Sequence, residues 1–322
     1  MTHTPRVSVI CVTYNHERFI AQSVGSALAQ EASFALEIVV AEDHSTDATR
    51  QICRELRLRH PGSIRLIESE VNLGPHGNFI EALGAADGEY LAILDGDDYW
   101  TDARKLQRQV DFMDGHPDCS ICFHSVVEQD EGAVSDPVLL RAAAEDRFYT
   151  IRDLMNGNFI PSCSVMLRRG LVKRLPDWYL DMPQGDWPLY ILNAQHGWIG
   201  YIDEAMAVHR IHAGSAWSGR RVSGELARIL AGYEVLISNF DASYRSALRA
   251  GQARHRRKLF DALMAEKRFP AAAVCLARYA RTPSSCRGSV RPLLKRLVVG
   301  MLPAGHRVYR MLRGNAAKAT GQ

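Results

Sequence analysis

YLAILDGDDYW, residues 90–100, joins five mostly apolar residues directly to three carboxylates, Asp95, Asp97 and Asp98. The apolar run predicts a buried strand, and the carboxylates follow at the point where this strand ends. Carboxylates this close together repel one another, and burying their charge is costly. The stretch therefore predicts that a positively charged group binds at the end of this strand.

Three similar units precede this stretch along the 322-residue chain. Their strands are apolar and rich in β-branched residues, as expected of parallel strands that are covered on both faces. A helical pattern follows each strand, and Ser45 or Thr46 is the candidate N-cap of the second helix. The strands are VSVICV (7–12), EIVVA (37–41) and IRLIE (64–68), and the helices cover about 17–29, 44–60 and 77–86. The alternation predicts an α/β fold with a Rossmann-like, mostly parallel sheet and helices on both faces.

The pattern loosens after residue 105 but still predicts an extension of the sheet. A helix to about Gly115 precedes two strand-like segments, CSICFHSVV (119–127) and CSVMLRR (163–169). A helix over 185–197 then has Asp186 at its start, and residues 199–215 look like a hairpin-like return. Beyond about residue 220 the chain reads as helical. We therefore expect an α/β domain over 1–219 and a basic helical region over 220–322.

Charge is divided unequally between these two regions. Residues 1–219 contain 18 Lys and Arg against 31 Asp and Glu, whereas residues 220–322 contain 21 against 5. The segment 291–314 places apolar residues at helical spacing among basic ones, namely Leu293, Leu294, Leu297, Val298 and Met301. This pattern predicts an amphipathic helix on an anionic membrane surface, or alternatively a helix that packs its apolar stripe on the protein. No motif or aromatic pattern supports nucleic-acid binding.

Targeting signals and common nucleotide motifs are missing from the sequence. The apolar run at 7–12 is too short for a signal peptide, and no 18 successive residues are apolar. Seven scattered cysteines indicate reduced thiols, so we expect a cytoplasmic protein, peripheral at the inner face of the membrane. Neither a G-x-G-x-x-G turn nor a phosphate-binding P-loop is present, which argues against a dinucleotide site and an NTPase.

Polar residues follow three of the predicted strands, where α/β sheets bind their ligands. They are Thr13, Tyr14 and Asn15 after the first strand, Glu42 and Asp43 after the second, and Asp95 to Asp98 after the fourth. Asp95-Gly96-Asp97 is a D-x-D arrangement that can present oxygens to one hard cation. Mg²⁺ and Mn²⁺ commonly bind one or two carboxylates together with substrate phosphates, so the pattern predicts a divalent-metal site.

Four segments in this order resemble the inverting glycosyltransferases of family 2, which have the GT-A fold. They are VSVICVTYNHERFIAQSVGSALAQ (7–30), EIVVAEDHSTDAT (37–49), NLGPHGNFIEALGAADGEYLAILDGDDYW (72–100) and QGDWPLY (184–190). The resemblance covers about residues 5–215. It implies a nucleoside diphosphate sugar as donor and a divalent metal, Mn²⁺ or Mg²⁺, as cofactor.

The resemblance also implies roles for single residues. Tyr14 would stack on the donor base beside Thr13 and Asn15, Asp43 would bind the base edge, and Asn78 would approach the donor. Asp95 would lie near the ribose and the metal, Asp97 would ligate the metal, Asp186 would be the catalytic base, and His212 would lie near the diphosphate or the metal. His44 and the pair Ala41-Glu42 depart from the family pattern, so the base preference stays open.

Each of these roles has a structural alternative. Asp43, Asp98 and Asp186 are also suited to cap helices, Tyr14 can be a core aromatic, and a loop histidine such as His212 is often polar surface. For the whole chain we expect sugar transfer to a hydroxyl of a saccharide or lipid-linked saccharide in surface polysaccharide synthesis. The alternatives are a sugar nucleotidyltransferase, whose glycine-rich Arg-Lys signature is absent, and a non-catalytic module that only binds sugar nucleotides.

Overall fold

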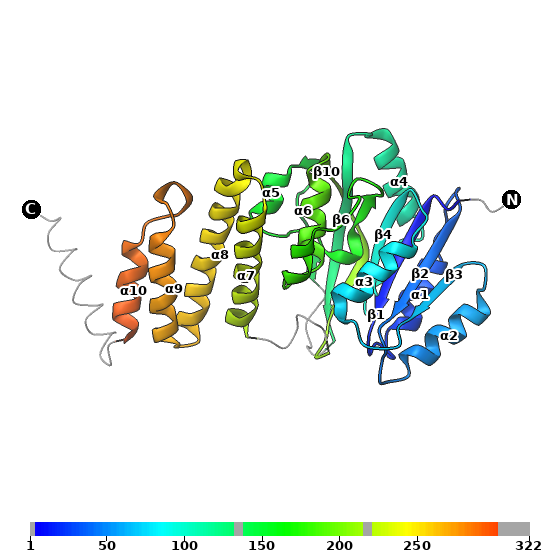
Figure 1. Ribbon diagram of the computed structural model, residues 1–322, viewed down its shortest axis with the longest axis horizontal. Coiled ribbons are helices and arrows are strands. Elements are labelled where there is room, and N and C mark those ends of the chain that lie inside the picture. Colours follow the sequence, from blue (N-terminus) through cyan, green and yellow to red (C-terminus); the bar gives the residue numbers. More distant parts are fainter. Residues whose placement is uncertain (1–3, 132–137, 215–220, 302–322) are drawn as a thin grey trace, which may run out of the picture. The chain divides into compact units, whose positions relative to one another are not determined.

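Four parallel strands carry the first part of the chain. They are β1 (Val7–Thr13), β2 (Leu36–Glu42), β3 (Ile64–Glu68) and β4 (Tyr90–Asp95), in the order β3-β2-β1-β4 (Figure 1). The register pairs Val12 with Ala41 on one side and with Asp95 on the other. The carboxyl ends of these strands therefore meet at one edge of the sheet, as the sequence predicted.

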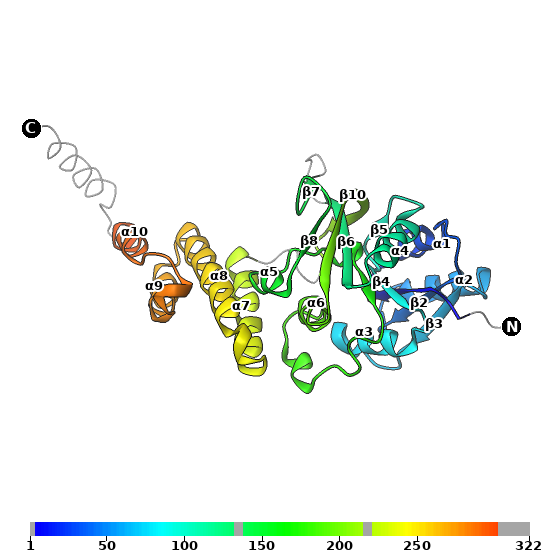
Figure 2. The same ribbon diagram turned by 90° about the horizontal axis from the view of Figure 1, so that it is seen from above.

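Helices cover both faces of these strands (Figure 2). The helices are α1 (Ile20–Leu28), α2 (Thr49–Arg59), α3 (Gly74–Ala85) and α4 (Lys105–Gly115). Apolar residues of α1, α2 and α4 share one buried cluster with β1, β2 and β4, whereas α3 lies on the opposite face. The open α/β sheet expected from the sequence is thus confirmed.

The predicted N-cap of the second helix is wrong. Helix α2 begins at Thr49, whose N–H donates to Asp47 Oδ1 at 2.9 Å. Ser45 and Thr46 instead bind Asn15 of the preceding loop, because the chain makes a wider turn between β2 and α2. The N-cap is therefore Ala48, and Asp47 accepts the N–H of the first helical residue from the position before the N-cap.

The second half of the sheet is mixed. Its strands are β5 (Tyr99–Trp100), β6 (Cys119–Asp130), β7 (Val138–Leu140), β8 (Arg147–Tyr149), β9 (Met166–Arg168) and β10 (Trp198–Ile211). Short α5 (Ile151–Met155) and α6 (Asp186–Ala194) lie between them in the sequence. Antiparallel β9 joins β4 to β6, and β10 runs parallel to β6.

The hairpin expected over 199–215 is wrong as well. Residues 198–211 form the single strand β10, and its register against β6 shifts between Ile202 and Ala205. Asp203 and Glu204 lie at this irregularity. A bulge lets a strand continue with an extra twist where the sequence alone suggests that it turns back.

The structure describes residues 4–131, 138–214 and 221–301, and it divides the chain into two compact units. The first contains residues 1–180 and 184–219, and the second contains residues 181–183 and 220–322. The second unit is helical, with α7 (Val222–Asn239), α8 (Arg245–Ala265), α9 (Phe269–Arg281) and α10 (Arg291–Met301) (Figure 1). None of the helices described is both long enough and apolar enough to span a membrane.

Helix α10 divides the apolar stripe noted in the sequence between two environments. Leu293 and Leu297 are buried and belong to the core of the second unit, together with residues of α8 and α9. Leu294, Val298 and Met301 are half exposed, at 50–54%. The packing alternative thus holds for part of the stripe, and an exposed apolar row remains. Residues 302–314 of the predicted segment lie outside the described residues.

Lys105, the first residue of α4, is completely buried in the first unit. Its Nζ donates to Gln109 Oε1 at 2.7 Å and lies 4.1 Å from the centroid of the Trp100 ring. Burial lowers the pKa of Lys105 to about 7. An unfolded lysine has a pKa of about 10.4, so the unfolded chain binds this proton more readily between pH 7 and 10.

We expect Lys105→Met to stabilise the fold below pH 7. There the wild-type lysine is protonated in both states, and the folded state carries the full cost of its buried charge. Replacement of buried ion pairs by apolar residues of similar volume is often neutral or stabilising by about 1–4 kcal/mol, and Lys105→Met removes a buried charge in the same way. The gain in the free energy of unfolding should shrink as pH rises toward 10, because Lys105 in the folded protein loses its proton around pH 7 and no longer buries a charge.

Urea denaturation at pH 6 and pH 9.5 measures this effect, with the exposed Lys173→Met as the matched control. A higher urea midpoint at pH 6 and a smaller increase at pH 9.5 are the expected results. An unchanged or lower midpoint of Lys105→Met at pH 6 would show that the Gln109 and Trp100 contacts fully compensate the buried charge.

Candidate active site

The carboxylates of YLAILDGDDYW stand at the carboxyl edge of the sheet. Asp95 ends β4, and its Oδ2 accepts a hydrogen bond from the Ser162 hydroxyl. Burial and, after it, the neighbouring charge of Asp97 raise the pKa of Asp95 to about 7. The charge of Asp186 acts in the same direction, so Asp186 belongs to the surroundings of Asp95.

Gly96 occupies a position that admits no side chain. A Cβ atom there would lie 2.7 Å from Thr13 Oγ1 and 2.9 Å from His16 Nδ1. Such contacts are closer than real Cβ atoms make. The glycine of the D-x-D motif therefore lets the turn after β4 pack directly on the loop after β1.

Asp97 lies between two imidazoles. Its Oδ2 is 3.1 Å from His212 Nε2 and 3.7 Å from His16 Nε2. Burial by itself would raise the pKa of Asp97, but the His212 hydrogen bond and the charge of His16 outweigh it and lower the pKa. Asp97 is therefore the carboxylate of this corner that carries its charge most readily.

Asp98 has a different environment and does not cap a helix. It is buried, and its Oδ1 accepts a hydrogen bond from the N–H of Arg210 at 2.8 Å. Burial, followed by the charges of Asp97 and Asp95, raises the pKa of Asp98 well above its usual range. The raised pKa favours the neutral form of Asp98, which adds less to the repulsion that the crowded sequence implied. Its contact with β10 ties the acidic corner to that strand.

Asp186 is the first residue of α6, while Gly185 is the N-cap. The side chain of Asp186 therefore does not hold the N-cap position, which was its structural alternative. Its Oδ2 accepts a hydrogen bond from Asn158 Nδ2 at 2.8 Å. Burial raises the pKa of Asp186, although the N–H groups of Trp187 and Asp186 and the Asn158 amide oppose the rise. A carboxylate with a raised pKa is suited to accept a proton near neutral pH.

The loop after β1 presents one exposed aromatic ring. Tyr14 is 42% exposed, so it is not a core aromatic. Thr13 is buried, and its hydroxyl lies 3.3 Å from His16 Nδ1. Asn15 has a left-handed backbone (φ 56°), and its Oδ1 accepts a hydrogen bond from the N–H of Thr46 at 2.8 Å. The Asn15 side chain thus joins the loops after β1 and β2.

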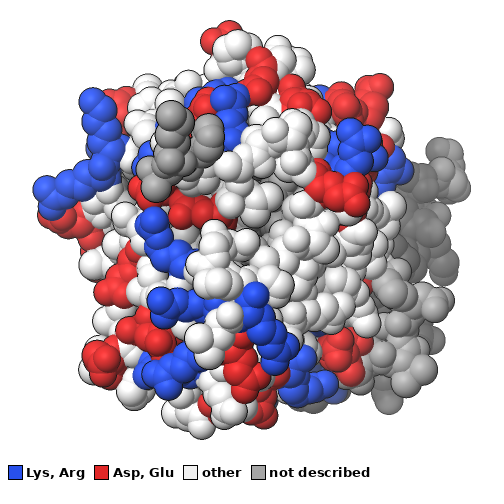
Figure 3. All heavy atoms as spheres, turned by 90° about the vertical axis from the view of Figure 1, so that its right-hand side faces the viewer, with Lys and Arg blue, Asp and Glu red and all other residues white. Residues whose placement is uncertain are grey.

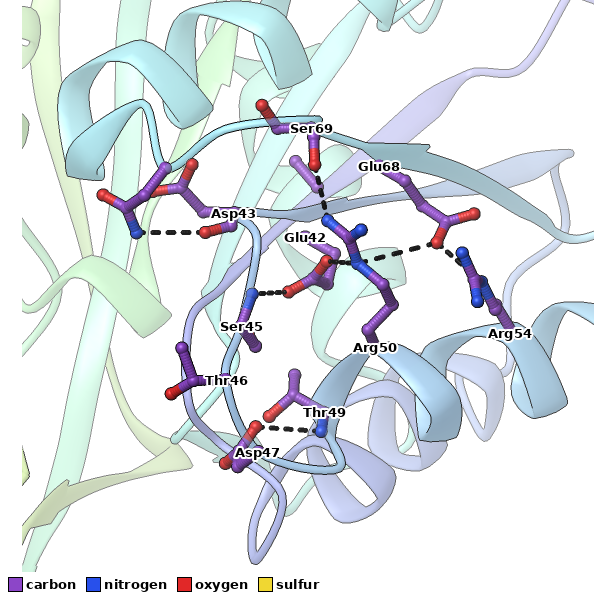
Figure 4. Close-up of polar contacts among 12 residues, drawn as sticks. Glu42, Asp43, Ser45, Thr46, Asp47, Thr49, Arg50, Arg54, Glu68 and Ser69 are labelled. Carbon is purple, nitrogen blue, oxygen red and sulfur yellow. Dashed lines mark hydrogen bonds and ion pairs between the residues drawn. The ribbon is translucent and has the colours of Figure 1, made fainter.

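The loop after β2 is held by a network of charged residues (Figure 4). Buried Glu42 accepts hydrogen bonds from the N–H of Ser45 at 2.6 Å and from Arg50 at 2.5 Å. Arg50 also donates to the carbonyl of Ser69, and it lies near Glu68. Glu42 therefore has a complete set of partners and serves to shape the loop.

Asp43, beside Glu42, binds the start of α3 and not the start of α2. Its Oδ1 accepts a hydrogen bond from the N–H of Leu73 at 2.7 Å, and burial raises the pKa of Asp43. Asn78 on α3 is also buried, and its Nδ2 donates to the carbonyl of Ala41 at 3.0 Å. Both residues attach α3 to the end of β2.

Several residues that contact the predicted site were missed in the sequence. They are His16, His76, Asn158, Ser162 and Arg210. His16 directly follows Asn15, so its position next to a predicted site residue could have identified it in the sequence. Asn158 lies in a loop and Ser162 begins a short 3₁₀ helix, neither carries a motif, and they are 28 and 67 residues from their partners Asp186 and Asp95. Only the tertiary structure brings these two residues to the carboxylates.

The described residues contain no group of three or more His, Cys, Asp or Glu side chains already arranged to hold a metal ion. The donor set nevertheless suits a cation that takes only part of its ligands from protein. Asp97 offers a charged carboxylate, and imidazole nitrogens lie beside it. Mg²⁺ and Mn²⁺ sites of this kind are completed by water and substrate phosphates.

Sequence comparisons place these features among known proteins. The family model described as Glycosyl transferase family 2 matches residues 8–175. An uncharacterized protein of Mycobacterium tuberculosis is 38% identical over 219 residues, which are 66% of this chain and 60% of that protein. The Escherichia coli UDP-Glc:alpha-D-GlcNAc-diphosphoundecaprenol beta-1,3-glucosyltransferase WfaP is 29% identical over 214 residues, covering 65% of this chain and 78% of WfaP. The chain thus spans about 60% of the length of the mycobacterial relative.

Solved structures show the same fold. S. aureus TarS 1-349 in complex with UDP-GlcNAc has a TM-score of 0.65 and 18% identity, covering 95% of this chain and 92% of TarS 1-349. The mannosyltransferase PcManGT from Pyrobaculum calidifontis, in complex with GDP-Man and Mn²⁺, has a TM-score of 0.57 and 21% identity, covering 97% and 85%. At these identities the likeness concerns the fold, and it confirms the GT-A architecture expected from the sequence.

Proposed function

The chain belongs to glycosyltransferase family 2, and from this premise we propose that it transfers a sugar, with inversion, from a nucleoside diphosphate sugar to a hydroxyl group. The acidic corner at Asp95 and Asp97 would hold the diphosphate through a divalent cation. Asp186 would take the proton of the attacking hydroxyl. One observation carries this proposal: Asp186, at the start of α6, lies close enough to Asp95 of the D-x-D motif for its charge to raise the pKa of Asp95.

The donor would bind along the carboxyl ends of β1, β2 and β4. Exposed Tyr14 is available to stack on the base, whereas Thr13 and Asn15 would shape the loop beneath it. Asp43 would bind the base edge from the end of β2, where its Oδ1 also accepts the hydrogen bond of Leu73. Asn78 would act through its hold on β2.

A cation, Mn²⁺ or Mg²⁺, would neutralise the diphosphate and act as a Lewis acid when this group leaves. Asp97 would hold it directly, because this carboxylate has a lowered pKa. Asp95 would lie next to it. The Ser162 hydroxyl would keep the Asp95 carboxylate oriented.

The chemistry needs one base. Asp186 would accept the hydroxyl proton on Oδ1, while Asn158 holds its Oδ2 in place. The acceptor oxygen forms a bond to the anomeric carbon as the bond from this carbon to the diphosphate breaks, and the electron pair leaves with the diphosphate. Attack from the face opposite the leaving group inverts the anomeric centre.

Incubation with a panel of UDP-, GDP- and dTDP-sugars and Mn²⁺, without acceptor, tests this proposal. Slow release of nucleoside diphosphate, which reflects transfer to water, is the expected result. Pyrophosphate formation from a sugar phosphate and a nucleoside triphosphate would indicate a nucleotidyltransferase instead. If neither reaction occurs and donor binding persists, the chain is a binding module.

For the acceptor we propose a lipid-linked saccharide of surface polysaccharide synthesis, used at the cytoplasmic face of a membrane. The printed name of the relative WfaP includes a diphosphoundecaprenol-linked sugar, which supports this class. On the face drawn in Figure 3, Lys and Arg are interspersed with Asp and Glu. We assign membrane contact to α10, because its exposed apolar row lies among basic residues in a region of high positive charge.

We expect the triple variant Leu294→Ser, Val298→Ser, Met301→Ser to bind anionic vesicles at least about tenfold more weakly than wild type. Removal of three exposed apolar side chains eliminates most of the apolar area that α10 can insert into a membrane. A loss of about 1.4 kcal/mol of binding free energy already weakens binding tenfold. Leu293 and Leu297 stay in the core, so the fold should persist.

Co-sedimentation with phosphatidylglycerol-containing and purely zwitterionic vesicles measures this binding. Leu58→Ser, on exposed α2 of the first unit, is the matched control. Equal sedimentation of the triple variant and wild type would refute the membrane role of α10. This design is preferable to deletion of the helix, because deletion would uncover the core of the second unit.

A further inference from the structure

Three buried polar atoms near Asp186 have no hydrogen-bond partner among the described residues. They are Gln184 Oε1, the Tyr190 hydroxyl oxygen and His76 Nε2. Gln184 is 7% exposed, and Tyr190 is completely buried. A buried polar atom without a partner is costly, and native structures keep few of them. A ligand that supplies the missing hydrogen bonds would explain why three such atoms occur beside the proposed base.

His76 lies against the start of α6. It stands in the first turn of α3, and a Cβ atom on Gly185, the N-cap of α6, would be 3.6 Å from its Cδ2 and Nε2. Its ring packs edge-on against Tyr179, with 5.6 Å between the ring centroids, and the Tyr179 hydroxyl donates to the Gly185 carbonyl at 2.8 Å. The charge of His76 also opposes the rise of the Asp186 pKa. The buried Nε2 of His76 therefore borders the residue that precedes Asp186.

Tyr190 approaches the same place from within α6. It follows Asp186 by four residues, and helix residues at this spacing lie on one face, with side chains that lean toward the helix N-terminus. Burial raises the pKa of Tyr190 well above its usual range, and the charges of Asp186 and then Asp95 add to the rise. Tyr190 is therefore within electrostatic reach of both the proposed base and the D-x-D motif.

These three atoms suit the hydroxyl groups of a sugar. Gln184 Oε1 can only accept a hydrogen bond, so its partner must be a donor. Ionised phosphate oxygens only accept hydrogen bonds, which excludes the diphosphate as this partner. A sugar hydroxyl both donates and accepts, so it fits Gln184 Oε1, the Tyr190 hydroxyl and either tautomer of His76. A group rich in hydroxyls thus satisfies all three atoms without any assumption about the proton of His76.

We propose that Tyr190, Gln184 and His76 form the subsite for the transferred sugar and hydrogen-bond its hydroxyl groups. This inference rests on the proposed function, which places the anomeric carbon between Asp186 and the diphosphate at the D-x-D motif. The sugar ring that carries this carbon then lies beside Tyr190, which is near both. An acceptor saccharide offers the same hydroxyl chemistry, and binding of the donor without acceptor separates the two sources.

The contribution of the sugar to donor binding provides the test. Calorimetric titrations with Mn²⁺ give the dissociation constants of UDP against UDP-Glc and UDP-GlcNAc, and of GDP against GDP-Man. The ratio within each pair measures what the sugar adds. For a pair in which the sugar tightens binding to wild type, Tyr190→Phe, Gln184→Met and His76→Ala should each reduce this ratio about two- to tenfold, the effect of one lost neutral hydrogen bond. The affinity for the nucleotide alone should not change.

Tyr149→Phe is the matched control. It also removes a buried hydroxyl without a described partner, but from an aromatic cluster with Phe123 and Phe159. Both Tyr→Phe variants should melt at or above the wild-type temperature, because neither loses a hydrogen bond of the free protein. Only Tyr190→Phe should reduce the contribution of the sugar, which a purely structural role of its hydroxyl would leave unchanged.

An unchanged ratio in all three variants would overturn the inference, as would a wild type that binds each nucleotide as tightly as its sugar derivative. If the ratio is unchanged while the KM for a lipid-linked saccharide acceptor rises, the three atoms bind the acceptor and the donor assignment is wrong. In both cases the proposed transfer reaction stands. If wild type binds neither UDP nor GDP with Mn²⁺, the donor site of the proposed function fails, and the sugar subsite fails with it.

Discussion

Asp186→Asn should lower the turnover number by about 10²- to 10⁴-fold while the affinity for the donor stays within about twofold. Asparagine has the size of aspartate, and its carbonyl oxygen can accept the hydrogen bond that Asn158 now donates to Asp186. The amide cannot take a proton from a hydroxyl. The loss should therefore appear in the chemical step and not in binding.

Two measurements separate these effects. Release of nucleoside diphosphate reports turnover, and calorimetric titration with the nucleotide and Mn²⁺ reports binding. Asp177→Asn, an exposed acid in the turn before α6, is the matched control and should behave as wild type. Near-normal turnover by Asp186→Asn would assign the base to another residue, and weak donor binding would assign Asp186 to the donor site.

Asp97→Asn should abolish the stabilisation that Mn²⁺ and a nucleoside diphosphate together confer on the native state. A ligand at 100 times its dissociation constant stabilises a protein by about 2.7 kcal/mol, which wild type should show as a raised melting temperature. Without the Asp97 charge, the cation loses its most readily ionised carboxylate, and the diphosphate then lacks a counter-charge.

Thermal unfolding with nucleotide alone, Mn²⁺ alone and both together gives the measurement. Asp111→Asn, at an exposed position of α4, makes the same change of charge without touching the site and is the control. A full melting-temperature increase in Asp97→Asn would mean that the diphosphate is held without this carboxylate. An increase from nucleotide alone in wild type would likewise remove the cation from the proposal.

Local pattern was sufficient for the elements that build the sheet. The β-branched runs at 7–12 and 37–41 are buried strands in the structure, as expected of strands covered on both faces, and the segment 64–68 is a strand at the edge of the sheet. Local pattern failed where the conformation of a segment depends on residues that are far away in the sequence. Residues 199–215 look like a hairpin, yet β10 continues through a bulge because β6 supplies a long partner strand.

The same limit applies to the charges of the site. Three adjacent carboxylates suggested a single cation as their counterpart. In the folded chain they differ: Asp97 has two imidazoles beside it, Asp95 has the Ser162 hydroxyl, and buried Asp98 binds the backbone of β10. Burial and these partners push their pKa values in different directions, which no spacing in the sequence can reveal.

By itself, the sequence determined the order of strands and helices, the edge at which ligands bind, and the family, because these follow from hydrophobic periodicity and from motifs within short segments. Only the tertiary structure decided which side chains meet there. Asn158 faces Asp186, and His16 faces Asp97 across a turn that Gly96 keeps narrow. Such contacts join residues tens of positions apart, and their distances and proton positions depend on packing that exists only once the chain has folded.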